Sequence, residues 1–166
     1  MKAFLIIGNL NAVTYKEVFP MIKEGKVRLG VNNGNMAFRV PPDSGPRATR
    51  YWQDDTGQKW RSLGNSCWFT NLEYDVRHNP IHLSARYTPE AYPKYDNYDA
   101  IEVGRTENIP CDYDGAMGVP ITFLDKYCPE QFEIIKFRHG DDGKDLAVNG
   151  KCPFCRILIR RRRTSS

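Results

Sequence analysis

Two amide side chains follow an apolar run near the start of the chain. Residues 4–7, Phe-Leu-Ile-Ile, are closed by Gly8, and Asn9 and Asn11 come directly after. A side-chain amide both donates and accepts hydrogen bonds, so it can match the edge of a nucleic-acid base. The same amides can instead cap the turn that ends the strand. The spacing alone leaves both roles open.

A second candidate site is the stretch between residues 47 and 69, where cations alternate with aromatic side chains. It contains all three tryptophans of the chain: Arg47, Arg50, Tyr51, Trp52, Lys59, Trp60, Arg61, Trp68 and Phe69. Exposed aromatic rings beside cations suit base stacking and phosphate contact. Nearby carboxylates balance these cations, so packing of the tryptophans into a core is equally open.

The pair Cys152 and Cys155 has the spacing of half a zinc site. Structural zinc needs four ligands, and the sequence offers no second pair at metal-binding spacing, so we expect no metal. His78 and His82 are four residues apart, but Pro80 between them argues against a shared helix face. Five cysteines and no secretory leader predict reduced thiols in a cytoplasmic protein.

Several familiar motifs do not occur. The chain has no glycine-rich loop after a strand, no P-loop and no GxSxG motif, and residues 141–145 fail the spacing of a calcium loop. The formal net charge of +4 equals the charge of Arg160 to Arg163, so the remaining chain is neutral. This terminal run either contacts phosphates or is a solvated tail. No apolar run is long enough to span a membrane.

These candidates need elements to position them, and 166 residues with 40% apolar content predict one globular domain. The continuous apolar run at residues 4–7 predicts a strand buried on both faces, as in a parallel sheet. Residues 14–17 form a capping-box pattern that predicts a short helix closed by Gly25. Pro20 indicates that this helix is kinked or begins later.

The rest of the chain reads mainly as β-structure. Alternation predicts a half-exposed strand at residues 26–31, followed by a turn at 32–35, and residues 67–72 form a further strand. Residues 41–64 predict a long loop or an elaborated hairpin. Residues 78–99 predict no firm element. The later predictions are strands at 100–103, 132–137 and 156–159, a turn at 112–115, and an apolar segment at 119–124 that leads a helical turn.

Ordered blocks of this sequence are similar to those of one enzyme family. The blocks are FLIIGNLNAVTYKE (4–17), LGVNNG (29–34), LGN and CWFTNL (63–72), KYDNYDAIEV (94–103), IP and DYDG (109–115) and MGVPITFLDKY (117–127). Together they resemble the C-terminal half of the EcoRI-type adenine-specific DNA methyltransferases.

The resemblance implies a Rossmann-like fold, S-adenosylmethionine as methyl donor, N6 of adenine in double-stranded DNA as acceptor and a role in restriction-modification. Such enzymes extrude the target base from the duplex. The family's Asn-Pro-Pro-Phe motif and cofactor loop have no counterpart in this sequence, whose one Pro-Pro pair, Pro41-Pro42, follows Val40. Catalytic residues therefore remain unknown, and the chain is expected to be inactive alone.

The resemblance carries over only the positions of these blocks, and no role for an individual residue. We expect an α/β fold in which residues 1–40 form the last strands of a partial Rossmann-like sheet with one helix, and residues 41–166 form DNA-contacting loops and a mixed, β-rich remainder. The candidate DNA-binding residues are Asn9, Asn11, Tyr15, Asn33, Arg47, Arg50, Arg61, Trp68, Phe69, Asn71, Lys94, Tyr95 and Asn97. An N-terminal methyltransferase half is a possible partner. The alternatives are a DNA-binding module, a separately encoded half-enzyme and a zinc-stabilised β domain.

Overall fold

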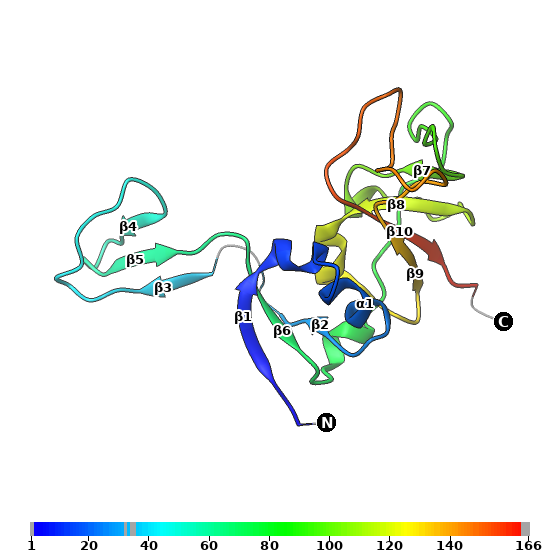
Figure 1. The fold of residues 1–166 in the computed structure, drawn as a ribbon. Helices are drawn as coiled ribbons and strands as arrows, with labels where there is room; N and C mark the ends of the chain where they lie inside the picture. The colour runs from blue at the N-terminus through cyan, green and yellow to red at the C-terminus, as the bar shows by residue number, and fades with distance from the viewer. Residues whose placement is uncertain (1, 32, 34–35, 164–166) are drawn as a thin grey trace.

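The computed structural model describes residues 2–31, 33 and 36–163. Short strands form three small sheets and short helices connect them (Figure 1). The strands are β1 (Leu5–Asn9), β2 (Arg28–Leu29), β3 (Ala37–Arg39), β4 (Tyr51–Gln53), β5 (Lys59–Ser62), β6 (Ser66–Thr70), β7 (Ala100–Glu102), β8 (Ala116–Pro120), β9 (Phe132–Phe137) and β10 (Arg156–Arg161). The helices are η1 (Leu10–Thr14), α1 (Val18–Lys23), η2 (Asp75–His78), η3 (Thr106–Asn108) and η4 (Ile121–Lys126).

The first sheet has the order β1-β6-β2, and both pairings are antiparallel. Strand β1 pairs along its whole length with β6 but lies at the edge of the sheet. Leu5 and Ile6 are each 57% exposed and Ile7 is 42% exposed. The predicted burial of β1 in a parallel sheet is therefore wrong for this structure, because within the described residues only β6 lies beside the strand.

The segment after β1 corrects a second prediction. Thr14 does not cap a helix; its Oγ1 donates to the carbonyl of Asn11 at 2.8 Å, within the 3-10 helix η1. Helix α1 begins at Val18, which places Pro20 in the first turn, where its missing N–H costs no helical hydrogen bond. Gly25, at φ 70°, follows the end of the helix, as the sequence predicted.

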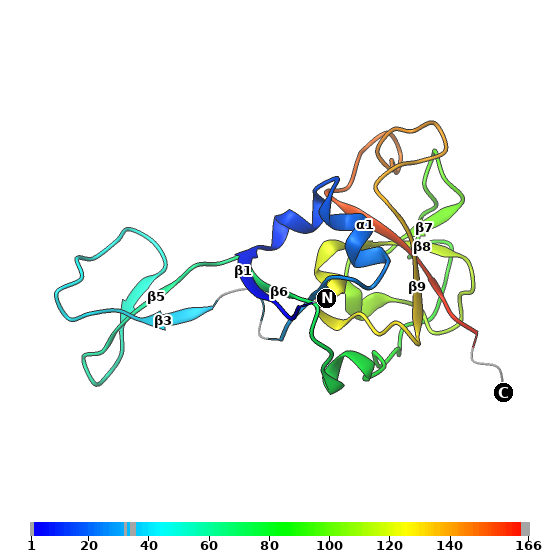
Figure 2. The ribbon, with the colours of Figure 1, turned by 60° about the horizontal axis from the view of Figure 1, so that its bottom comes forward.

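Strands β3, β5 and β4 form a separate antiparallel sheet, confirming the elaborated hairpin predicted for residues 41–64. Figures 1 and 2 show this sheet projecting away from the rest of the molecule. We call residues 36–62 the arm. The turn predicted at residues 32–35 lies mostly outside the described residues, and the strand predicted at 26–31 shortens to the two residues of β2.

The largest sheet has the order β7-β8-β10-β9, with β7 parallel to β8 and the other pairs antiparallel. The strands predicted in the C-terminal half are all present. Phe123, Phe132 and Ile157 are fully buried between this sheet and the helices packed on it. Gly118 leaves no room for a side chain, because the ring of Tyr95 lies directly against it.

The chain is thus a mixed α/β structure dominated by strands. None of the described helices is long and apolar enough to span a bilayer.

Candidate nucleic-acid interface

The turn after β1 uses one of its two amides internally. Asn9 caps η1, because its Oδ1 accepts from the backbone N–H of Asn11 at 2.8 Å. The side chain of Asn11 lies exposed, and Tyr15 is 58% exposed. These three residues therefore lie together on the surface at the carboxyl end of β1. The capping role holds for Asn9 and leaves the Asn11 amide available to a ligand.

An open groove of about 320 Å³ lies beside β1 and α1. Apart from Lys26, its lining is apolar: Phe4, Ile6, Ala12, Val18, Met21, Val27 and Phe69. Phe69, one of the predicted DNA-binding residues, is itself buried in the main core beneath this groove. Lining of this kind suits another apolar surface better than a charged or polar ligand.

Asn33 ties three segments together. Its Nδ2 donates to the carbonyl of Gly30 at 2.6 Å and to Asp125 Oδ1 at 2.9 Å, and its Oδ1 accepts from the backbone N–H of Trp68 at 3.1 Å. Burial raises the pKa of Asp125, although the hydrogen bond from Asn33 opposes the shift. The amide is fully engaged, so Asn33 holds the segment after β2 against β6 and η4.

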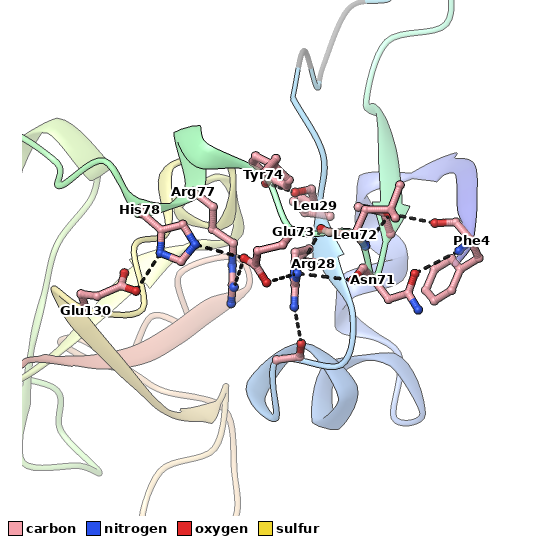
Figure 3. Close-up of polar contacts among 12 residues, drawn as sticks. Phe4, Arg28, Leu29, Asn71, Leu72, Glu73, Tyr74, Arg77, His78 and Glu130 are labelled. Atoms are coloured by element: carbon pink, nitrogen blue, oxygen red, sulfur yellow. Dashed lines mark hydrogen bonds and ion pairs between the residues drawn. The ribbon is translucent and has the colours of Figure 1, made fainter. Parts of the chain in front are cut away.

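Asn71 fixes the N-terminal segment in the same way (Figure 3). Its Oδ1 accepts from the backbone N–H of Phe4 at 3.0 Å, and its Nδ2 donates to the carbonyl of Lys2 at 3.0 Å. Thr70 Oγ1 adds a bond of 2.7 Å to the Phe4 carbonyl. The end of β6 therefore anchors the segment that enters β1.

Arg28 is the centre of a polar cluster that sequence reasoning missed (Figure 3). Its side chain is largely buried and donates to the carbonyls of Gly25 and Leu72, at 2.8 and 3.0 Å, and to Glu73 Oε2 at 2.5 Å. Its Nε is buried with no hydrogen-bond partner among the described residues. A lone arginine in a short alternating segment carries no signal of such a role.

Glu73 extends the cluster, through His78, to Glu130 in the turn before β9. It accepts from Arg77 at 2.7 Å and lies 3.2 Å from His78 Nε2, while His78 Nδ1 lies 2.7 Å from Glu130 (Figure 3). Desolvation raises the pKa of Glu73, but the stronger combined effect of Arg77 and Arg28 holds this pKa below its usual value. The hydrogen bond to Glu130 raises the pKa of His78, and the same bond holds the pKa of Glu130 at about 2.

The predicted residues between 94 and 97 lie in another part of the molecule. Tyr95 is 5% exposed, and its hydroxyl donates to Glu102 within the core of the largest sheet. Asn97 accepts from the Ala147 N–H at 3.0 Å and donates to the carbonyl of Asp145 at 2.9 Å. Only Lys94 keeps an exposed side chain, 3.5 Å from the carboxylate of Asp99. Direct contact of Tyr95 with DNA would require it to leave the core.

Four of the five cations of the arm divide into two groups, and the fifth, Arg39, lies over the ring of Trp60. Arg50 donates to the carbonyl of Leu63 at 2.9 Å, and Lys59 donates to the carbonyls of Pro42 and Ser44, at 2.5 and 3.1 Å. These two side chains hold the arm together. The side chains of Arg47 and Arg61, by contrast, have neither a hydrogen bond nor an ion pair to any residue in the described part of the chain.

The lining of the groove beside β1 does not suit S-adenosylmethionine. The groove beside β1 offers no carboxylate to hold ribose hydroxyls, and no glycine-rich loop follows a strand where an adenosine could lie. Within residues 2–31, 33 and 36–163, no three histidine, cysteine or acidic side chains gather as metal ligands. Cys152 is exposed, and Cys155 is partly buried at φ 37° in a loop.

Comparison with known proteins decides the family. Residues 1–162 match the model of the family described as adenine-specific methyltransferase EcoRI. The chain belongs to this family. It is 52% identical to the type II methyltransferase M.EcoRI of Escherichia coli over 166 residues, which is 98% of this chain and 51% of that protein.

Two further relatives come from mycoplasmas. The chain is 32% identical to M.MpnI of Mycoplasma pneumoniae and 33% identical to M.MgeORF184P of Mycoplasma genitalium, covering 97% and 96% of this chain and 57% of each relative. This EcoRI-family chain therefore spans about half the length of the curated relatives it matches. No solved structure matches it.

Proposed function

We propose that this chain forms the C-terminal part of a site-specific DNA methyltransferase. The complete enzyme transfers the methyl group of S-adenosylmethionine to N6 of adenine in double-stranded DNA, and the target base leaves the duplex to be reached. Membership of the EcoRI family supports the activity. The sequence lacks the family's Asn-Pro-Pro-Phe motif and its glycine-rich cofactor loop, so we assign this chain no step of methyl transfer and expect it to be inactive alone.

Strand β1 is the observation that carries this proposal. Its apolar side chains, Leu5, Ile6 and Ile7, are exposed, and one of its edges has no partner strand among the described residues. An exposed apolar edge strand is a template for further pairing. We infer that the remainder of the enzyme, within one polypeptide or as a separate chain, extends a Rossmann-like sheet from this edge.

Asn11 and Tyr15 follow from the same proposal. Ligands of open α/β sheets bind beyond the carboxyl ends of the strands, which is where both residues lie exposed. We propose that they face the DNA in the complete enzyme, while Asn9 shapes the turn that carries them.

The testing experiment is methyl transfer from labelled S-adenosylmethionine to duplex DNA, with N6-methyladenine as the detected product. The samples are this chain, the part of an EcoRI-type enzyme that it does not cover, and the two mixed. We expect product only in the mixture. Robust transfer by this chain alone would show that the donor pocket lies within it.

A DNA-binding module is the second candidate function, and the exposed cations of the arm favour it. A module binds duplex DNA, yet methylates none when mixed with the complementary part. The mixture therefore separates the two functions.

A further inference from the structure

The arm presents two faces that differ in how far their polar groups are satisfied. Strand register places Arg39, Trp60 and Trp52 opposite one another across the three strands. The neighbouring register places Phe38, Arg61 and Tyr51 opposite one another in the same way. Because side chains alternate along a strand, these two rows lie on opposite faces of the sheet.

The tryptophan face is satisfied internally. The rings of Trp52 and Trp60 are stacked, with centroids 6.4 Å apart and planes 8° apart. The guanidinium of Arg39 lies 5.5 Å from the Trp60 ring centroid, and Trp60 Nε1 donates to Asp54 Oδ2 at 2.8 Å. We therefore assign this face a structural role within the arm, since its aromatic and charged groups already have partners there.

The opposite face carries cations and aromatic rings without a carboxylate. Strand alternation places Lys59 and Gln53 on it beside Phe38, Arg61 and Tyr51. Phe38 is 40% exposed, and Arg61 has no polar partner among the described residues. We call this surface the basic face.

The side chain of Arg61 is partly exposed, and the loop between β3 and β4 adds a fully exposed cation, Arg47. Lys59 shapes this loop through its bonds to Pro42 and Ser44, so a side chain of the basic face also positions the segment leading to Arg47. Residues 36–62 contain five cationic and three carboxylate side chains. One of these carboxylates, Asp54, accepts hydrogen bonds from Thr56, Gln58 and Trp60 and is engaged within the arm.

The arm buries almost nothing of its own. Among its described residues only Ser62 is buried, although the sheet is ordered by its ladder and by the tryptophan stack. The main cores contain no residue of the arm, so the core does not require it.

We propose that the arm grips duplex DNA through its basic face, with Arg47 and Arg61 on phosphates and Phe38 against the groove, largely independently of base sequence. This inference rests on the proposed function, because it takes DNA as the substrate of the complete enzyme. Phosphate contacts position a protein on DNA without reading its bases. The guanidinium of Arg61 has no polar partner among the described residues and lies on a face without a carboxylate. This combination favours DNA over a second protein chain as the ligand.

The test measures binding of the 166-residue chain to fluorescently labelled duplexes by anisotropy at a series of salt concentrations. The double variant Arg47→Ala/Arg61→Ala removes two cations from the arm. Lys144→Ala/Lys151→Ala is its charge-matched control, because both lysines are exposed and lie outside the arm. Each lost phosphate contact reduces the slope of log K against log salt by about 0.9, so the arm variant loses about 1.8.

At about 0.1 M salt the same arithmetic predicts a loss of affinity on the order of 60-fold for the arm variant. The control keeps the slope of the unaltered chain. The loss is the same for duplexes of different sequence. Phe38→Ala weakens binding without changing the slope, because it removes no charge. Circular dichroism of each variant establishes that the fold is retained.

Two results overturn the inference: equal slopes for the arm variant and its control, or no DNA binding by the unaltered chain at low salt. Capture of a protein partner by the arm with unchanged DNA binding overturns it as well. Arm-dependent DNA binding combined with no methyl transfer by the mixed halves contradicts the proposed function and leaves the inference standing. If the arm variant changes neither methyl transfer by the mixed halves nor DNA binding, the inference about the arm is overturned and the proposed function stands.

Discussion

Asn9, Asn33, Asn71 and Asn97 were all candidate DNA contacts by position, and each carries an amide that is engaged inside the chain. An asparagine beside a strand end looks the same in sequence whether it faces a ligand or ties two loops together. Among the other candidates, Asn11, Tyr15 and Arg47 are exposed, Arg61 is partly exposed, and the exposed Lys94 pairs with Asp99. The role of each asparagine depends on partners up to 92 residues away, which spacing does not reveal.

His78 is expected to titrate above its ordinary pKa of 6.5, because its hydrogen bond to Glu130 favours the protonated ring. The pair stabilises the fold fully below the unfolded pKa of His78, and this contribution is lost as pH rises through the folded value. NMR titration measures the pKa directly. In Glu130→Gln the pKa should fall, although Glu73 still lies beside the ring. An unchanged pKa would contradict the pairing.

Arg156→Met should destabilise the protein by about 3–5 kcal/mol, because it leaves Glu102 charged and largely buried. The guanidinium donates to both carboxylate oxygens of Glu102, at 2.6–3.0 Å. Urea unfolding measures the change. The double variant Arg156→Met/Glu102→Gln removes both charges and should recover most of the loss. A cost below about 1 kcal/mol for the single variant would mean that the pair is solvated.

At the scale of elements, local patterns predicted β6, β7, β9 and β10 well, because hydrophobic alternation reports which faces the same chain covers. The prediction for β1 was wrong in its burial and its pairing direction. Under the proposed function, a pattern for burial on both faces reports the environment of β1 in the complete enzyme, of which the described residues supply only part. The capping box failed because Thr14 is the last residue of η1, a 3-10 helix that buries Leu10 and Val13, and not the N-cap of α1.

Asp54→Ala should loosen the arm without unfolding the core. Hydrogen bonds, first from Thr56 and then from Trp60, hold the pKa of Asp54 at about 2, so its carboxylate is ionised at neutral pH. We expect faster hydrogen exchange across residues 36–62 and unchanged exchange in β7 to β10. This contribution is present above about pH 3.8 and is lost as pH falls through about 2. Equal acceleration in both regions would show that the arm and the core unfold together.

Substitutions on β1 should separate folding from assembly. Leu5→Lys/Ile6→Lys replaces two exposed side chains, so the stability of this chain should change by no more than about 0.5 kcal/mol per site. Binding to the complementary part of the enzyme should be lost, because lysines on an edge strand oppose further strand pairing. Calorimetric titration of the two parts measures this, with Lys144→Ala as the control. Unimpaired binding would place the contact elsewhere.

At the scale of the whole molecule, a well-packed C-terminal sheet carries two less complete features: the free edge of β1 and the projecting arm (Figure 1). Both features make sense if the remainder of an EcoRI-type enzyme covers β1 and DNA lies along the arm. The family could be predicted from ordered sequence blocks. The division of the arm into a satisfied face and a basic face could not, since it depends on strand register.

The central claim is that this chain is one part of a catalytic unit completed at β1. The most direct measurement is the rate of labelled methyl incorporation into duplex DNA as this chain is added to a fixed amount of the complementary part. The predicted rate is zero without this chain, rises to a plateau at equal amounts of the two parts, and stays at zero with Leu5→Lys/Ile6→Lys. Full activity with that variant, or methyl transfer by this chain alone, would contradict the claim.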